Sequence, residues 1–195
     1  MELGGFLERL DLLDKHLDSF RDFWPFTPWV DGRISPRGTP HWDALARVPL
    51  KAGSSGVVMV EAKAHRGEFV KPDDKSGAQP EALSKIKASF ETVRAFYGIS
   101  ATAPAWESRY YQVGNRLAHL YWMNEDAKVP TWLVWVFVVD DPVWRDGLSA
   151  SEWHEAFETV KKEIGLPSQH PLVDRVVAVY LPPAPEPTSA VVASS

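Results

Sequence analysis

The sequence contains no cysteine, which excludes disulfide bonds and thiolate metal sites. It also lacks an excess of positive charge: 21 Lys and Arg residues face 26 Asp and Glu residues, for a formal net charge of −5. A surface that is basic overall is therefore not expected, although a local basic groove for nucleic acid is compatible with this balance. No apolar run approaches the roughly 20 residues that span a membrane, and the N-terminal stretch lacks the pattern of a signal peptide. We expect a cytoplasmic protein with no membrane partner.

The motifs of several common enzyme classes are missing as well. The sequence has no GxxxxGK[ST] phosphate loop, no GxGxxG dinucleotide motif, no GxSxG nucleophile turn and no HExxH zinc helix. It does have 45% hydrophobic residues and nine tryptophans in 195 residues, enough for one domain with a sizeable core. We expect a single domain over residues 1–182, followed by a proline-rich, disordered tail at 183–195.

The spacing of apolar residues predicts alternating helices and strands. Helical periodicity occurs at 2–23, 81–98, 105–124 and about 150–164, the last with Ser149 or Ser151 as its N-cap. Apolar or alternating runs predict strands at 42–48, 56–63, 131–140 and 174–181, the first two as an antiparallel hairpin. Polar, turn-rich loops are expected at 24–40 and 66–80. This order predicts an α/β fold with a mixed central sheet flanked by helices.

The strongest candidate site lies where the predicted hairpin strands end. In the stretch VVMVEAKAH, the side chains of Glu61, Lys63 and His65 project from one face because they are two residues apart. If the chain reverses near Gly53, Asp43 comes opposite Glu61, and two such carboxylates repel each other unless a cation joins them. Mg²⁺ (or Mn²⁺) favours carboxylate oxygens. With such a cation bound, Lys63 can position the attacking water for phosphodiester hydrolysis.

This pattern resembles the PD-(D/E)XK nuclease superfamily, which has the restriction-endonuclease-like fold. In that superfamily an Asp ends one core strand and a (D/E)XK triplet lies on the next; here Asp43 precedes the triplet Glu61-Ala62-Lys63 by seventeen intervening residues. The resemblance covers about residues 1–140, and the proline of the superfamily name is absent before the Asp. It implies a further metal-binding acid on the first helix, for which Glu8 is the nearest candidate. The stretches PRGTPHWDAL, VEAKAH and NRLAHL are also similar to a group of bacterial proteins, which implies the fold and no particular activity.

A simpler interpretation of the triplet stays open. An E-x-K sequence occurs by chance in many proteins, and Glu61 and Lys63 can form an ion pair worth roughly 0–1 kcal/mol. Two features favour a metal site over this interpretation. The VVMV run predicts a central strand, where surface charges without a function are less expected, and Asp43 precedes it on the predicted partner strand.

A second polar group lies on the predicted helix 105–124. Gln112, Asn115, Arg116 and His119 fall within an arc of roughly 100° on that helix. An amide pair, a guanidinium and an imidazole are suited to orienting an oxygen-rich ligand, so these four residues and His65 are the candidate substrate-binding residues. The alternative is a hydrogen-bonded network that ties the helix to the sheet.

Two functions follow from these patterns. The first is a Mg²⁺-dependent nuclease in which Asp43, Glu61 and Glu8 hold the metal, Lys63 completes the catalytic set and nucleic acid is the partner. A homodimer is a further expectation, because many enzymes that cleave two strands act as dimers. The second function is a noncatalytic module on the same scaffold that binds nucleic acid or protein, which the acidic net charge favours.

Overall fold

The computed structural model describes residues 19–20, 22–25, 41–51, 53–70, 79–100, 104–145 and 147–183. Of the helix predicted over 2–23, the described residues 19–20 and 22–23 are helical. Glu8, most of the loop predicted over 24–40 and the tail from residue 184 lie outside the described residues.

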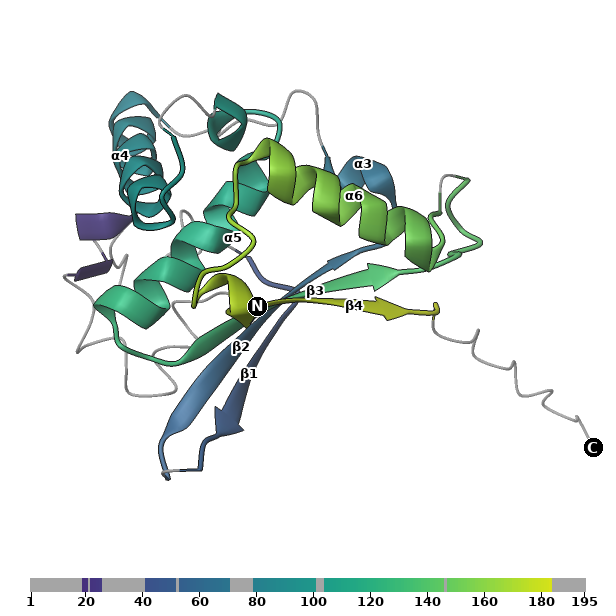
Figure 1. Cartoon of the computed structure of the whole chain (residues 1–195), viewed down its shortest axis with the longest axis horizontal. Helices are drawn as coiled ribbons and strands as arrows, with labels where there is room; N and C mark the ends of the chain where they lie inside the picture. The colour runs from purple at the N-terminus through teal and green to yellow at the C-terminus, as the bar shows by residue number, and fades with distance from the viewer. Residues whose placement is uncertain are drawn as a thin grey trace, which may run out of the picture.

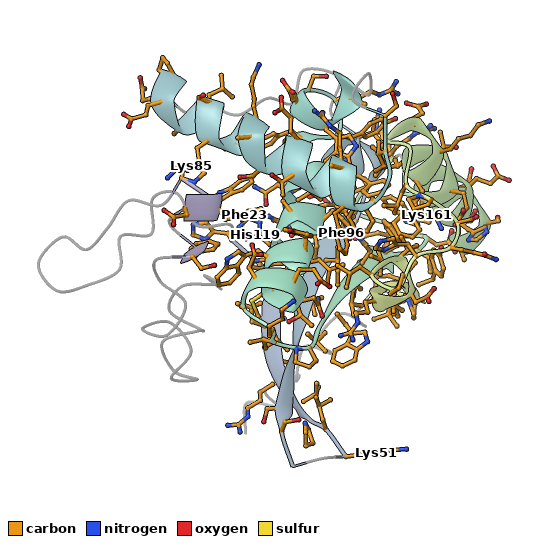
Figure 2. The ribbon with its side chains drawn as sticks, turned by 60° about the vertical axis from the view of Figure 1, so that its left-hand side comes forward. Phe23, Lys51, Lys85, Phe96, His119 and Lys161 are labelled. Carbon is orange, nitrogen blue, oxygen red and sulfur yellow. The ribbon has the colours of Figure 1, made fainter. Side chains whose placement is uncertain are left out.

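A four-stranded mixed sheet forms the centre of the fold. It contains, in spatial order, β1 (Ala44–Pro49), β2 (Ser55–Lys63), β3 (Thr131–Val138) and β4 (Val176–Leu181). β1 and β2 pair antiparallel, as the predicted hairpin requires, and β3 and β4 each run parallel to their neighbour. The turn between β1 and β2 contains Gly53 at φ 76°, a left-handed conformation that glycine adopts without steric cost. The tip of this hairpin, where Lys51 lies, projects away from the helices (Figure 2).

Three longer helices pack on one side of this sheet (Figure 1). They are α4 (Pro80–Phe96), α5 (Tyr111–Tyr121) and α6 (Ala150–Glu163). The predicted N-cap of α6 is Ser149: its side chain accepts a hydrogen bond from the Glu152 N–H, and Glu152 bonds back to the Ser149 backbone in a capping box. The mixed sheet with its helices confirms the predicted α/β class.

Three predicted segments differ from the structure. The helix predicted over 105–124 is divided into a 3-10 turn at Pro104–Glu107, α5, and a π-helical turn at Trp122–Asp126. The loop predicted over 66–80 begins with a short helix, α3 (Arg66–Phe69), because Phe69 turns inward and is 2% exposed among core aromatic rings. A further 3-10 turn, Val173–Arg175, precedes β4 and shortens the predicted last strand.

Apolar side chains dominate both faces of the sheet. Met59, Leu133, Trp135 and Phe137 alternate along β2 and β3 on the face toward the helices, and each is at most 1% exposed. On the opposite face, the strand register brings together only apolar side chains: Ala44, Ala46, Val48, Val58, Val60, Ala62, Trp132, Val134, Val136, Val138, Val177, Val179 and Leu181. In the described residues, no helix is both long and apolar enough to cross a membrane.

Candidate functional site

Glu61 and Lys63 end β2 on the face that the helices cover. They continue the alternation of Val57 and Met59, and they are only 3% and 6% exposed. The Lys63 Nζ lies 2.5 Å from the Glu61 Oε1, so the two side chains form a buried ion pair. Because burying a charge is costly unless it is paired, this pair must be stabilised by further partners on the facing helix.

α5 supplies those partners from two positions one helical turn apart. Gln112 donates from Nε2 to the Glu61 Oε1 at 2.9 Å. Arg116 donates from Nε to the Glu61 Oε2 at 2.8 Å, and its Nη2 lies 2.7 Å from the same oxygen in an ion pair. Both oxygens of the Glu61 carboxylate therefore accept charged or amide donors, and the group is held in one orientation between β2 and α5.

The guanidinium of Arg116 has additional contacts that fix it in place. Its Nη1 donates to the Asn115 Oδ1 at 3.1 Å, and its Nη2 donates to the backbone oxygen of His41 at 2.7 Å. The guanidinium carbon lies 4.4 Å from the centroid of the Trp42 ring, a cation–π contact. Arg116 is 6% exposed, so its donors are directed to groups of the protein.

Asp43 lies immediately before β1, at the end of the hairpin where Glu61 and Lys63 are. Ala44 pairs with Val60, so the same register carries Asp43 opposite Glu61, as predicted. The Asp43 side chain is exposed, and its Oδ2 accepts the N–H of Ala62 at 2.6 Å. The carboxylate is thus bonded to the residue between Glu61 and Lys63.

The donor set of this site fits a hard divalent cation. The register sets the exposed Asp43 opposite the buried Glu61, and Mg²⁺ is usually held by one or two carboxylates together with several waters. Among the described residues, no three His, Cys, Asp or Glu side chains converge on one point. The predicted third acid, Glu8, lies outside the described residues.

His119, on the same helix, lies in the aromatic core. It is 0% exposed, and the rings of Phe20 and Trp24 contact it edge-on at centroid distances of 5.8 and 4.7 Å. Its Nδ1 donates to the Asn115 backbone oxygen at 2.8 Å, and its Nε2 has no hydrogen-bond partner among the described residues. Burial lowers the pKa of His119 to about 3, so the imidazole is neutral at physiological pH. Figure 2 shows it where α5 meets the segment of Phe23.

His65 lies beyond the end of β2 and points to a different neighbour. Its ring packs against Trp144 at a centroid distance of 4.1 Å, and its Nε2 lies 3.7 Å from the Glu68 Oε1. Glu68 also accepts the N–H of Ala64 through Oε2 at 2.9 Å, which holds the start of α3 against the end of β2.

Two contributors to this region were not predicted from the sequence. The structure places the ring of Trp42, which no motif singles out, against Arg116. Trp144 was not singled out, although it follows a predicted strand in a segment with turn residues. Neither role follows from local spacing, because each depends on a residue distant in the sequence.

Comparison of the chain with protein-family models, curated proteins and solved structures finds no match. The functional argument therefore depends on the geometry of the site itself and on the resemblance of its motif.

Proposed function

We propose that the protein is a metal-dependent nuclease with a restriction-endonuclease-like fold, which hydrolyses phosphodiester bonds of nucleic acid. One observation carries the proposal: the β1–β2 register sets Asp43 opposite Glu61, and the Lys63 ammonium contacts the Glu61 carboxylate. Two carboxylates and an amine at the end of adjacent strands are the groups that this chemistry needs. Asp43 at the end of one hairpin strand and the triplet Glu61-Ala62-Lys63 on the next also agree with what the motif resemblance implies.

Each residue of the site has a distinct role in this proposal. Asp43 and Glu61 would hold Mg²⁺ or Mn²⁺, which when bound would supply a Lewis acid for the charge that develops on a phosphate oxygen. Lys63 would position the attacking water next to Glu61. Gln112 and Arg116 are positioning residues, because their hydrogen bonds fix the orientation of the Glu61 carboxylate.

The remaining candidates act less directly. Asn115 accepts a hydrogen bond from Arg116 and is 9% exposed, so it supports the guanidinium. His119 is enclosed by aromatic rings, and we assign it no contact with substrate.

A noncatalytic binding module is the second candidate function. One observation favours it: Glu61 already accepts hydrogen bonds from Lys63, Gln112 and Arg116, so its charge is compensated without any added ligand. In this alternative the network fastens α5 to β2, and the protein binds nucleic acid or a protein partner without cleaving it.

Cleavage of labelled single-stranded and duplex DNA and RNA, with Mg²⁺ or Mn²⁺ and with EDTA, tests the proposal. We expect cleavage that requires the metal and is lost in Lys63→Met, which keeps most of the side-chain volume. Lys51→Met, on the exposed tip of the hairpin, is the matched control and should retain full activity.

Metal binding provides a second readout that does not depend on cleavage. Mg²⁺ or Mn²⁺ should raise the melting temperature of the wild type, and this rise should vanish in Asp43→Asn. Metal-dependent cleavage by Lys63→Met at the wild-type rate would overturn the catalytic role proposed for Lys63 and with it the assignment of this site as the catalytic centre. Absence of cleavage and of any metal response in the wild type would favour the noncatalytic module.

A further inference from the structure

Trp144 lies in the loop that follows β3 and forms an aromatic pair with His65. Trp144 is 42% exposed and its neighbour Val143 is 75% exposed, the largest exposure among the large hydrophobic residues that the structure describes. One side of the Trp144 ring packs on the imidazole of His65, with centroids 4.1 Å apart and planes 30° apart. The Trp144 ring of this pair thus presents aromatic surface to solvent.

This pair lies at the same edge of the sheet as the proposed catalytic residues. β2 and β3 run parallel, and Lys63 pairs with Phe137 at their common end. His65 follows Lys63 by two residues, and the loop with Trp144 leaves the end of β3. Figure 1 shows this loop and α3 beyond the arrowheads of these two strands.

Acidic and basic groups both lie near the pair, and Asp140, in the same loop as Trp144, is exposed. Two carboxylates are engaged with backbone: Glu68 accepts the N–H of Ala64 at 2.9 Å, and Asp141 accepts the N–H of Val143 at 2.9 Å. Arg66 and Arg145, each adjacent in sequence to one member of the pair, are exposed. Neither arginine forms an ion pair within the described part of the chain.

We propose that His65 and Trp144 form a stacking platform for an unpaired nucleobase, and that Arg66 and Arg145 contact the flanking phosphates. The inference rests on the proposed nuclease function and assigns it a substrate class, single-stranded nucleic acid. A base within a duplex has both faces covered by its neighbours, so only an unpaired base can stack on the exposed indole. Stacking of this kind tolerates any base sequence, since every base has a π-face.

Binding in EDTA tests the platform without cleavage. The probes are fluorescein-labelled oligodeoxythymidine, oligouridine and a mixed-sequence DNA duplex, followed by fluorescence anisotropy. Trp144→Ala should weaken binding of the single strands roughly 5- to 150-fold, the range for losing one base–aromatic stack. Trp144→Phe should restore part of the affinity, and Val143→Ala is the matched control and should bind within about twofold of the wild type.

The phosphate contacts have a separate readout. Arg145→Gln should reduce the slope of log affinity against log salt by about one, because one phosphate contact is removed. Melting curves of each variant check that it is folded.

The outcomes separate this inference from the nuclease proposal. If Lys63→Met abolishes cleavage while Trp144→Ala binds single strands as tightly as the wild type, the platform is wrong and the nuclease stands. If Trp144→Ala weakens binding but no protein cleaves, the platform stands and the nuclease is wrong. A wild type that binds no single strand, or binds the duplex equally well with no effect of Trp144→Ala, overturns the platform.

Discussion

The Lys63 Nζ lies 2.5 Å from the Glu61 Oε1, and the two side chains are only 7% and 4% exposed. The Glu61 carboxylate is at the same time bonded to Arg116, so one buried anion serves two buried cations. This arrangement is asymmetric. Removing the anion leaves both cations unpaired, whereas removing Lys63 leaves Glu61 paired with the guanidinium.

The asymmetry predicts different stabilities for two variants. Glu61→Gln should lower the free energy of unfolding by about 3–5 kcal/mol, the range for removing one partner of a buried ion pair. Lys63→Met should cost less than about 2 kcal/mol, because the remaining ion pair is intact and the stem of the side chain is replaced. Urea unfolding measures both values. Equal losses, or a greater loss in Lys63→Met, would contradict the proposed role of Glu61 as the shared anion.

Arg116 should contribute far more to stability than an arginine on the surface. Arg116→Met leaves Glu61 paired with Lys63, but it takes the donor from both the Glu61 Oε2 and the His41 backbone oxygen, and should cost about 2–5 kcal/mol. Arg109→Met is the matched control: Arg109 is 49% exposed and lies 3.7 Å from Glu163, so its loss should cost at most about 1 kcal/mol. Similar losses in the two variants would show that burial does not decide the contribution of Arg116.

The sheet was largely predictable because its strands are marked locally. The run TWLVWVFV is apolar on both faces, and the hairpin is marked by Gly and Ser between two strand-like segments. α3 was missed because its short helix depends on burial of Phe69 against Trp135 and Phe137, which lie far away in the sequence. The π-helical turn after α5 also depends on tertiary contacts: the Asn124 side chain bonds the backbone of Thr131 at the start of β3.

The candidate site was predictable in part for the same reason. The period of a strand places Glu61 and Lys63 on one face, and the antiparallel pairing carries Asp43 opposite Glu61. Helical spacing also grouped Gln112 with Arg116. That these two donate to Glu61 depends on how α5 docks on the sheet, which local spacing does not determine. The burial of His119 also depends on how α5 docks on the sheet.

Gly114 allows α5 to approach its neighbours, and its substitution tests that docking. A Cβ at this position would lie 2.9 Å from Trp106 Cε3 and 3.3 Å from Phe90 Cζ. Gly114→Ala should therefore lower the free energy of unfolding by about 1–3 kcal/mol through overpacking, although alanine favours a free helix by about 1 kcal/mol over glycine. Ala88→Gly, at an exposed position of α4, should show the ordinary propensity cost of about 1 kcal/mol. A stabilising effect of Gly114→Ala would show that α5 is not closely packed against Trp106 and Phe90.

His119 should make stability depend on pH in a defined window. Its pKa is lowered from 6.5 to about 3 in the folded protein, chiefly by burial, with the Arg116 charge acting in the same direction and the hydrogen bond to Asn115 opposing it. Between these two values the unfolded chain binds a proton that the folded protein does not. Stability therefore falls as the pH falls from 6.5 toward 3, by at most about 1.4 kcal/mol per pH unit, and His119 contributes no slope above 6.5.

Two variants and a titration isolate this contribution. His119→Gln removes the titrating ring and should flatten the slope of unfolding free energy between pH 6 and 4, as followed by urea unfolding at each pH. His154→Gln, at an exposed position of α6, should keep the wild-type slope. In the NMR spectrum of the wild type, the ring signals of His119 should stay constant from pH 7 down to about pH 4. A His119 ring that titrates near 6.5 would mean that water reaches it, and its enclosure by Phe20 and Trp24 would then be wrong.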